Sequence, residues 1–173
     1  MEALGRLFDI SLGIISGTDL SGGFTGKRIC MENYGGIGCL LVASAVGTTD
    51  DPVPSIQQHT AYTGGTSADL ACMDKIYRKS ETLLDGDEAW TKTTQTAAAI
   101  MTAVAGEAEK ENIYYWEVQA SDLTAGYTHI SVNYAALGTD AKLGVLLYIP
   151  FDLKVQRTPA NMPNPLNPGA ANV

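Results

Sequence analysis

The sequence predicts a mainly β protein, an antiparallel β-sandwich or a jelly-roll or barrel-like domain with extended N- and C-terminal arms. Residues 112–153 predict three successive strands, because Tyr, Trp, Val and Ile give the composition of a half-buried pleated surface. Eighteen glycines and seven prolines indicate frequent turns. With 45% hydrophobic and 17% charged residues, the 173-residue chain is globular and can bury a core.

The first half of the chain predicts short strands separated by glycine and proline. One helical turn is expected at 4–7. The Gly35-Gly36 pair predicts either the turn of a hairpin over 27–46 or a bulge inside one long bent strand. A loop is expected at 47–54. The remaining strands are expected at 10–15, 55–62, 75–79 and 90–96.

Residues 97–111 carry two conflicting patterns. Their alanines and glutamates favour a helix ending near Gly106, but apolar and threonine residues from 96 to 104 also alternate with a period of two. A short helix and an edge strand both fit. The three later strands are expected at 113–120, 129–135 and 141–151. The links at 121–127 and 137–140 contain the Asp, Gly and Thr of turns.

The two ends differ in composition from the middle. Residues 1–24 predict an N-terminal arm or a lead-in strand, and 25–153 the sandwich domain. Residues 158–173 hold four prolines, four asparagines and no charged side chain, so they can build neither a ladder nor a helix. The sequence therefore predicts a C-terminal arm over 154–173.

Charge and cysteine content limit the possible roles. A net charge of −8 disfavours direct nucleic-acid binding, which needs a basic surface. No segment approaches the ~20 apolar residues of a membrane span, and the N-terminus lacks a signal-peptide pattern. The three cysteines, Cys30, Cys39 and Cys72, show no metal or disulfide spacing. They predict buried free thiols in a soluble protein made in a reducing cytoplasm.

No motif predicts catalysis, a cofactor or a metal. The acidic turn at 85–88 lacks the ligand spacing of an EF-hand. Ser121, Asp122 and His129 lack a nucleophile elbow, and His59 has no partner pattern. Residues 114–116, Tyr-Tyr-Trp, suggest a stacking platform, but alternation along a strand favours core and cross-strand packing. The sequence therefore predicts a protein that is not an enzyme.

Several segments, in order over about residues 10–152, resemble a known group of proteins. They include MENYG, DKIYRK, EVQASDL and AKLGVLLY. The group comprises virion structural proteins of tailed bacteriophages of the head decoration or cement kind. The resemblance implies a β-sandwich with terminal arms, located on the outside of the capsid, which bridges subunits of the major capsid protein to stabilise the shell. It also implies a homo-oligomer, dimer or trimer, on the shell.

Under this hypothesis the ends of the chain are the candidate capsid contacts. The residues are Leu4, Leu7, Phe8 and Ile10 at the N-terminus, and Met162, Pro163, Pro165 and Leu166 in the tail. An alternative is a minor capsid or vertex protein whose exposed loops bind a host surface glycan through aromatics such as Trp90 or Tyr127. A third hypothesis, a small polysaccharide-acting enzyme, requires two carboxylates converging in a groove.

Overall fold

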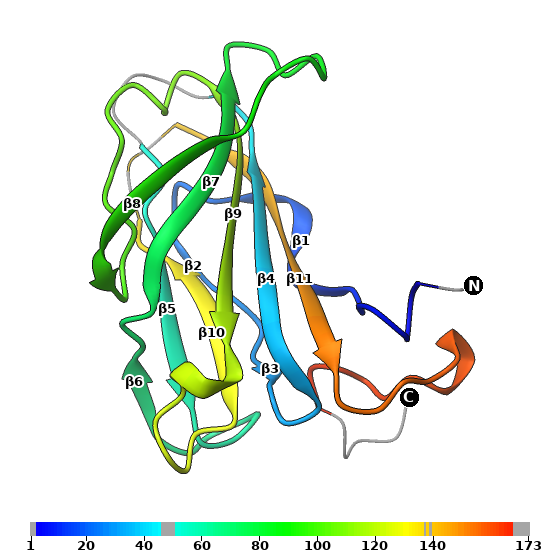
Figure 1. The fold of residues 1–173 in the computed structure, drawn as a ribbon. Coiled ribbons are helices and arrows are strands. Elements are labelled where there is room, and N and C mark those ends of the chain that lie inside the picture. The colour runs from blue at the N-terminus through cyan, green and yellow to red at the C-terminus, as the bar shows by residue number, and fades with distance from the viewer. Residues whose placement is uncertain (1–2, 46–50, 137, 139, 168–173) are drawn as a thin grey trace.

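Two antiparallel sheets packed face to face make up the fold (Figure 1). The computed structural model describes residues 3–45, 51–136, 138 and 140–167. Its strands are β1 Ser11–Asp19, β2 Phe24–Thr25, β3 Ile29–Cys30, β4 Tyr34–Ala43, β5 Pro54–His59, β6 Ser67–Asp69, β7 Met73–Glu81, β8 Thr91–Ala98, β9 Glu111–Gln119, β10 His129–Tyr134 and β11 Leu143–Leu153; short 3-10 turns occur at Ala120–Asp122 and Pro159–Asn161. Among the residues described, no helix is long and apolar enough to cross a membrane.

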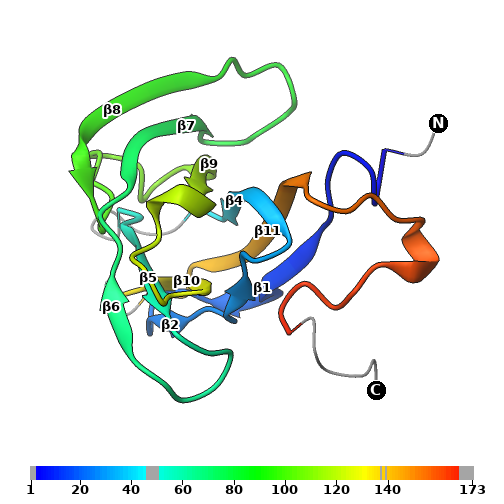
Figure 2. The same cartoon turned by 60° about the horizontal axis from the view of Figure 1, so that its bottom comes forward.

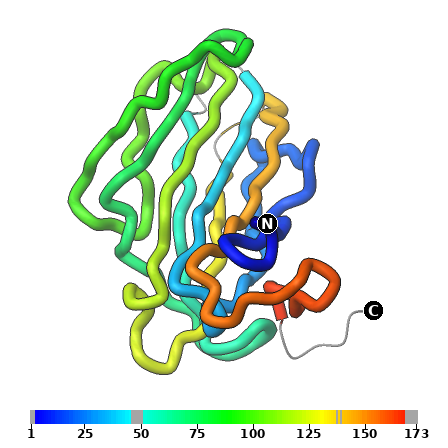
Figure 3. The backbone as a smooth tube through the Cα atoms, turned by 45° about the vertical axis from the view of Figure 1, so that its right-hand side comes forward, coloured from blue at the N-terminus to red at the C-terminus, as the bar shows by residue number. Residues whose placement is uncertain are grey.

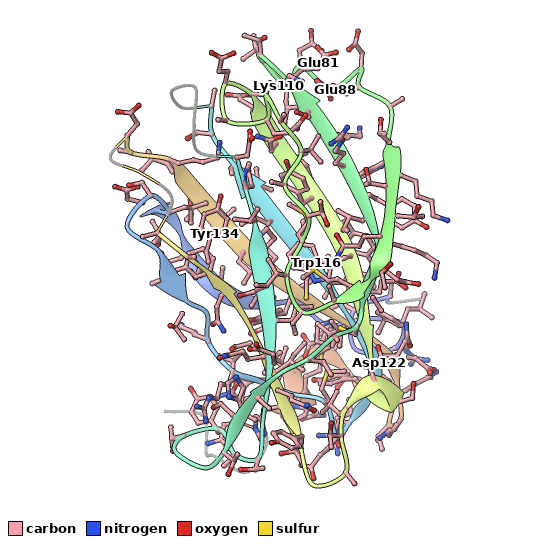
Figure 4. All side chains as sticks on the ribbon, turned by 90° about the vertical axis from the view of Figure 1, so that its left-hand side faces the viewer. Glu81, Glu88, Lys110, Trp116, Asp122 and Tyr134 are labelled. Carbon is pink, nitrogen blue, oxygen red and sulfur yellow. The ribbon has the colours of Figure 1, made fainter. Side chains whose placement is uncertain are left out.

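The strand order explains how the layers form. One sheet runs β1-β11-β4-β9-β7-β8, and the other runs β2-β10-β5-β6, with β3 also paired to β10. Figure 2 shows β5, β6 and β10 as a layer separate from β4, β9 and β11. Alternate side chains of β4, β9, β5 and β10 point between the layers and form one core. Trp116 of β9 lies inside this core and is completely buried (Figure 4). The predicted β-sandwich is confirmed.

Strand predictions based on local alternation are confirmed. The expected strands at 10–15, 55–62, 75–79 and 90–96 correspond to β1, β5, β7 and β8. The three later strands are β9, β10 and β11, but β10 belongs to the opposite sheet from the other two. Parts of the expected loop at 47–54 and of the link at 137–140 lie outside the described residues, as do 168–173 of the tail.

The predicted hairpin over 27–46 is wrong, and so is the single bent strand. The chain turns at residues 32–33 instead, so that β3 and β4 belong to different sheets. Gly35 and Gly36 lie within β4 and have no positive φ. They are needed for close approach, since a Cβ on Gly36 would collide with the ring of Phe151.

Residues 97–111 form no helix, and the alternative edge-strand prediction holds only for 97–98, which end the edge strand β8, and for Ile100, which makes an isolated bridge to Ser55. After β8 ends at Ala98, an irregular segment crosses to the other sheet, where Ile56 N donates to Ala99 O at 2.8 Å. Its later backbone is held by side chains. Asp51 accepts bonds from the amides of residues 107 and 108, and Asn112 Nδ2 donates to Glu107 O at 2.7 Å. These side chains satisfy the backbone without regular structure.

The tail turns back onto the domain along its described length. Cys30 N donates to Pro165 O at 3.0 Å, and Leu166 packs against the core. Arg157 N donates to Gly5 O at 2.8 Å, so the N-terminal segment lies beside the segment that follows β11, as Figure 3 shows. This contact places the N-terminal segment against the tail at one end of the sandwich.

One hydroxyl joins the two sheets where a ladder is interrupted. Between β2 and β3, which both pair with β10, the chain leaves the sheet at residues 26–28. The phenol of Tyr148, on β11 of the opposite sheet, fills this break: it accepts from Val132 N at 2.9 Å and donates to Lys27 O at 3.0 Å. Tyr148 is completely buried. A side chain thus supplies the partner that a neighbouring strand does not.

Replacing Tyr148 by phenylalanine is expected to lower the free energy of unfolding by about 2 kcal/mol, because it leaves the buried amide of Val132 without a partner and removes the bond to the Lys27 carbonyl. Urea unfolding followed by circular dichroism measures the change. Tyr115→Phe is the matched control, since its hydroxyl bonds Glu117 at the surface, and it should change stability by less than about 0.5 kcal/mol. Equal effects of the two substitutions would contradict the role assigned to Tyr148.

Candidate functional site

The outer face of the six-stranded sheet carries a continuous row of apolar and aromatic side chains. In register across five strands lie Leu12, Leu147, Leu40, Tyr115 and Tyr77. Cross-strand partners share a face, and their inward-pointing neighbours Leu41, Tyr114 and Ile76 form the core. Antiparallel sheets with one solvated face usually place polar residues there. The row therefore marks this face as unusual.

A second apolar row lies beside the first. Val145, Val42 and Ile113 are direct partners on β11, β4 and β9, and Ile149 continues the outward positions of β11. We call the outward residues of β1, β11 and β4 the apolar face: Leu12, Leu40, Val42, Val145, Leu147 and Ile149. Leu12 is 42% exposed and the others are half-buried. At one end the face is hollowed by a cavity of about 380 Å³, which Leu84 and Leu143 also line.

An aromatic groove lies next to the apolar face, on the same outer face of the sheet. A depression of about 530 Å³ is lined by Tyr77, Trp90, Tyr115 and Glu117. A second, of about 460 Å³, shares two of these residues and is lined by Ala71, Cys72, Asp74, Lys75, Tyr77, Ala97, Glu117, Gln119 and Asp122. We call the two together the aromatic groove. It lies over β7, β8 and β9, beside the apolar face.

Glycine in β4 determines the position of Tyr115 in the groove. A Cβ on Gly38 would lie 2.7 Å from the Tyr115 ring, so the ring rests directly on the β4 backbone. Its hydroxyl donates to Glu117 Oε1 at 2.9 Å. Burial, and then this bond to Glu117, raise the pKa of Tyr115 above its usual value. Tyr115 therefore stays neutral and fixed at both ends.

The charged groups of the groove are largely paired. Lys75 Nζ lies 2.7 Å from Asp74 Oδ2, and this hydrogen bond lowers the pKa of Asp74. Asp122 Oδ2 accepts a bond from Gln119 N at 2.8 Å and closes the turn after β9. Lys79 Nζ lies 5.5 Å from the centroid of the Trp90 ring. Asp74, kept ionised, is poorly suited to donate a proton in catalysis.

The structure brings the predicted N-terminal and tail contacts to the same end of the sandwich. Leu4, Leu7 and Ile10 are 37%, 63% and 53% exposed, while Phe8 is half-buried and bridges Phe151. In the tail, Met162 and Pro163 line a small cleft beside Tyr34. Pro165 and Leu166 make the contacts with β3 and the core described above. The N-terminal side chains are thus available on the surface, and the tail side chains are mostly occupied.

Sequence reasoning missed the apolar face. The signal was present in 141–151, where apolar residues occur at consecutive positions rather than alternating, but the run was used only to predict a strand. Of the two aromatics suggested for glycan binding, Trp90 lines the groove and Tyr127 does not. The Tyr-Tyr-Trp cluster divides as expected, with Tyr114 and Trp116 in the core and Tyr115 outside.

The remaining candidate groups are explained by local structure. Carboxylate oxygens of Asp85, Asp87 and Glu88 lie within 4.8 Å of one another, but Glu88 Oε1 accepts bonds from two amides of its own turn. His59 bonds Ser67 Oγ at 2.7 Å and Ser131 Oγ at 2.8 Å in the other sheet. Burial lowers the pKa of His59 to about 4. This turn and this histidine therefore have structural explanations.

All three cysteines are free thiols, with Cys30 and Cys39 buried and Cys72 half-buried. Burial raises the pKa of Cys30 to about 11 and that of Cys72 to about 12, and it raises the pKa of Cys39 well above the usual value. A thiol that stays protonated is a weak nucleophile and a weak metal ligand. The cysteines therefore contribute packing, as the sequence predicts.

Comparison with known proteins gives little guidance. No family model matches the chain, and no curated protein matches it. Among solved structures, the crystal structure of the SPBc2 prophage-derived protein YomS is similar over 83% of this chain and 91% of that chain, with 10% sequence identity and a TM-score of 0.39. A likeness this weak carries no argument about function.

Proposed function

We propose that this protein is a non-enzymatic virion structural protein of a tailed phage, which binds the outside of the capsid and bridges subunits of the major capsid protein. The observation that carries the proposal is the apolar face, together with the exposed N-terminal residues beside it. The resemblance of several sequence segments to head decoration or cement proteins supplies the identity of the partner.

The apolar face has the character of a protein contact. Exposed apolar area in contact with water is unfavourable by roughly 25 cal/mol per Å², and contiguous patches on soluble proteins usually mark interaction sites. The face offers aliphatic side chains on a rigid sheet, which lose little conformational entropy on binding. A net charge of −8 fits a partner that is protein rather than DNA.

The N-terminal edge extends this surface. Leu4, Leu7, Ile10, Leu12 and Ile15 are all large, apolar and exposed, the last by 62%. They follow one another along the chain up to and into β1, which pairs with β11 and is the first strand of its sheet. An edge strand offers unpaired backbone groups that a strand of a neighbouring subunit can bond.

The tail has a supporting role in this proposal. Its described part folds back on the domain, and the bond from Arg157 N to Gly5 O fixes the N-terminal segment in place. In the N-terminal segment we therefore assign direct contact to Leu4, Leu7, Phe8 and Ile10, next to the apolar face and β1. Met162, Pro163, Pro165 and Leu166 anchor the tail on the domain rather than reaching a neighbour themselves.

The proposed mechanism is mechanical. A shell filled with compressed DNA is pushed outward, and its subunits separate only if the contacts that bridge them are broken. A standard interface buries about 1,600 Å² in total, and the symmetry of the shell repeats it many times. Small binding free energies at each site thus add up to a stronger shell.

Binding to empty shells of the major capsid protein, measured by co-sedimentation, tests this proposal. The double variant Leu12→Asp, Ile15→Asp should bind at least about tenfold more weakly than the wild type, because it places charges inside the contact. Both residues are exposed in the free protein, so the variant should fold. Leu83→Asp is the matched control: Leu83 is 66% exposed on the β7–β8 hairpin and should be neutral.

Two results would overturn the proposal. One is unchanged shell binding by the double variant. The other is dimer formation by the free protein through this face. If the double variant were monomeric but still bound shells, the face would be a contact between copies of this chain rather than with the shell. Light scattering after gel filtration separates these outcomes.

A further inference from the structure

The aromatic groove exposes rings that contribute nothing to the core. Tyr77 and Tyr115 are cross-strand partners whose ring centroids lie 6.5 Å apart at an angle of 47°. Trp90 is 51% exposed beside them. Aromatic side chains on a surface lose favourable burial, so three of them around one depression indicate a site for a ligand with an apolar face.

The rings are held in place before any ligand arrives. Tyr115 rests on the backbone at Gly38, and its hydroxyl is bonded to Glu117. Tyr77 comes from the middle of β7, which is paired on both sides. A site that is already ordered loses little entropy on binding. The rings therefore form a platform rather than a flexible loop surface.

Polar groups surround the platform on the side of the second depression. Asp74, Lys75, Glu117, Gln119 and Asp122 provide carboxylate, ammonium and amide groups within the same lining. Figure 4 shows Asp122 far from Glu81, Glu88 and Lys110. Asp122 therefore marks the end of the groove that lies away from those three residues. Rings on one side and hydrogen-bonding groups on the other match a pyranose, which has an apolar C–H face and a rim of hydroxyls.

The charges of the groove select among ligands. Its three carboxylates, on Asp74, Glu117 and Asp122, repel acidic sugars and phosphates. Three ammonium groups balance them: Lys75 in the lining, Lys79 beside Trp90, and Lys92 directly opposite Tyr77. An apolar peptide would remove water from these carboxylate and ammonium groups without offering them hydrogen bonds, at a high cost. The combination favours a neutral ligand rich in hydroxyl groups.

We propose that the aromatic groove binds a neutral oligosaccharide. Tyr77, Tyr115 and Trp90 stack on sugar rings, and Glu117, Gln119 and Asp74 accept or donate hydrogen bonds to hydroxyls. Adjoining depressions of about 460 and 530 Å³ lie within the ~300–1,000 Å³ range of ligand pockets, enough for a short oligosaccharide. The groove and the apolar face lie on different strands of the sheet, so this activity does not depend on the proposed shell binding.

A glycan array that includes neutral and acidic oligosaccharides tests the inference on the purified full-length protein. At least one neutral oligosaccharide should bind, and titration calorimetry with that compound should show at least about a tenfold loss of affinity for Tyr77→Ala and for Trp90→Ala. Tyr77→Phe keeps the ring and should keep most of the affinity. Tyr127→Ala, an aromatic outside the groove, is the matched control and should have no effect.

Three results would overturn the inference: no neutral compound bound on the array, binding restricted to acidic glycans, or affinity lost in Tyr127→Ala but kept in the groove variants. Thermal unfolding of each variant verifies that it folds, and the exposure of Trp90 makes Trp90→Ala safe in this respect. Because no shells are present, a negative result here leaves the shell-binding proposal unaffected, and failure of shell binding leaves this one unaffected.

Discussion

Replacing Glu107 by alanine is expected to lower the free energy of unfolding by about 3 kcal/mol, because it removes the anion from a buried polar cluster. Glu107 is 3% exposed. Its Oε1 lies 3.3 Å from Lys110 Nζ and 3.9 Å from Arg78 Nη1, and Tyr114 donates to its other oxygen at 3.4 Å. Without Glu107, Arg78 loses this ion-pair partner and the irregular segment before β9 loses an anchor.

Urea unfolding at neutral pH measures this effect. Lys110→Gln is the control, since the Lys110 side chain is 39% exposed and an exposed ion pair contributes at most about 1 kcal/mol. If Glu107→Ala is no more destabilising than Lys110→Gln, the cluster does not anchor the segment in the way described.

Lowering the pH from 6.5 to 4 is expected to destabilise the fold by about 3 kcal/mol through His59 alone. Burial, and then the charges of Arg28 and His129, lower its pKa from 6.5 to about 4. Between these pH values the unfolded chain binds a proton at His59 that the native state does not bind. The stability that neutral His59 contributes is therefore fully present above pH 6.5 and is lost as the pH decreases. One pKa unit corresponds to about 1.4 kcal/mol, which gives the total.

The neighbouring groups modify this profile in a predictable direction. The pKa of His129, the cross-strand partner of His59, is also lowered by burial, against an opposing effect of Glu32, so it adds to the loss on acidification. Denaturant midpoints at pH 7, 5.5 and 4 test the profile. His59→Gln should be less stable at pH 7 but show a shallower decline. An equally steep decline in His59→Gln would assign the pH dependence to other groups.

The parts of the fold that could be predicted from the sequence are those that local periodicity determines. Alternation identified β5 and β9 because their inward side chains, such as Ile56 and Trp116, contact the core at every second position. Most of residues 97–111 could not be predicted, since the amides of residues 107 and 108 are bonded by Asp51, which lies 56 and 57 residues away in the chain and which no local pattern identifies.

The candidate surfaces show the same division. The apolar face was visible as consecutive apolar residues in β11, but only the register with β1 and β4 shows that Leu12, Leu147 and Leu40 lie side by side. The aromatic groove depends on β7 pairing with β9, which brings Tyr77 to Tyr115 across 38 residues of chain. Strand order is set by long-range packing, so sequence reasoning could name Trp90 and Tyr115 as separate candidates but could not place them in one groove with Tyr77.

The hydrogen bond to Tyr148 also makes the amide hydrogen of Val132 a measure of transient separation of the two sheets. Most amides of β10 exchange with solvent only when their own ladder opens, whereas Val132 N is bonded to a side chain of the opposite sheet. Separation of the two sheets would expose this hydrogen even while β10 stays paired to β5. The difference in protection between Val132 and its ladder-bonded neighbours therefore measures how often the sandwich opens along its middle, independently of the fraying of either sheet.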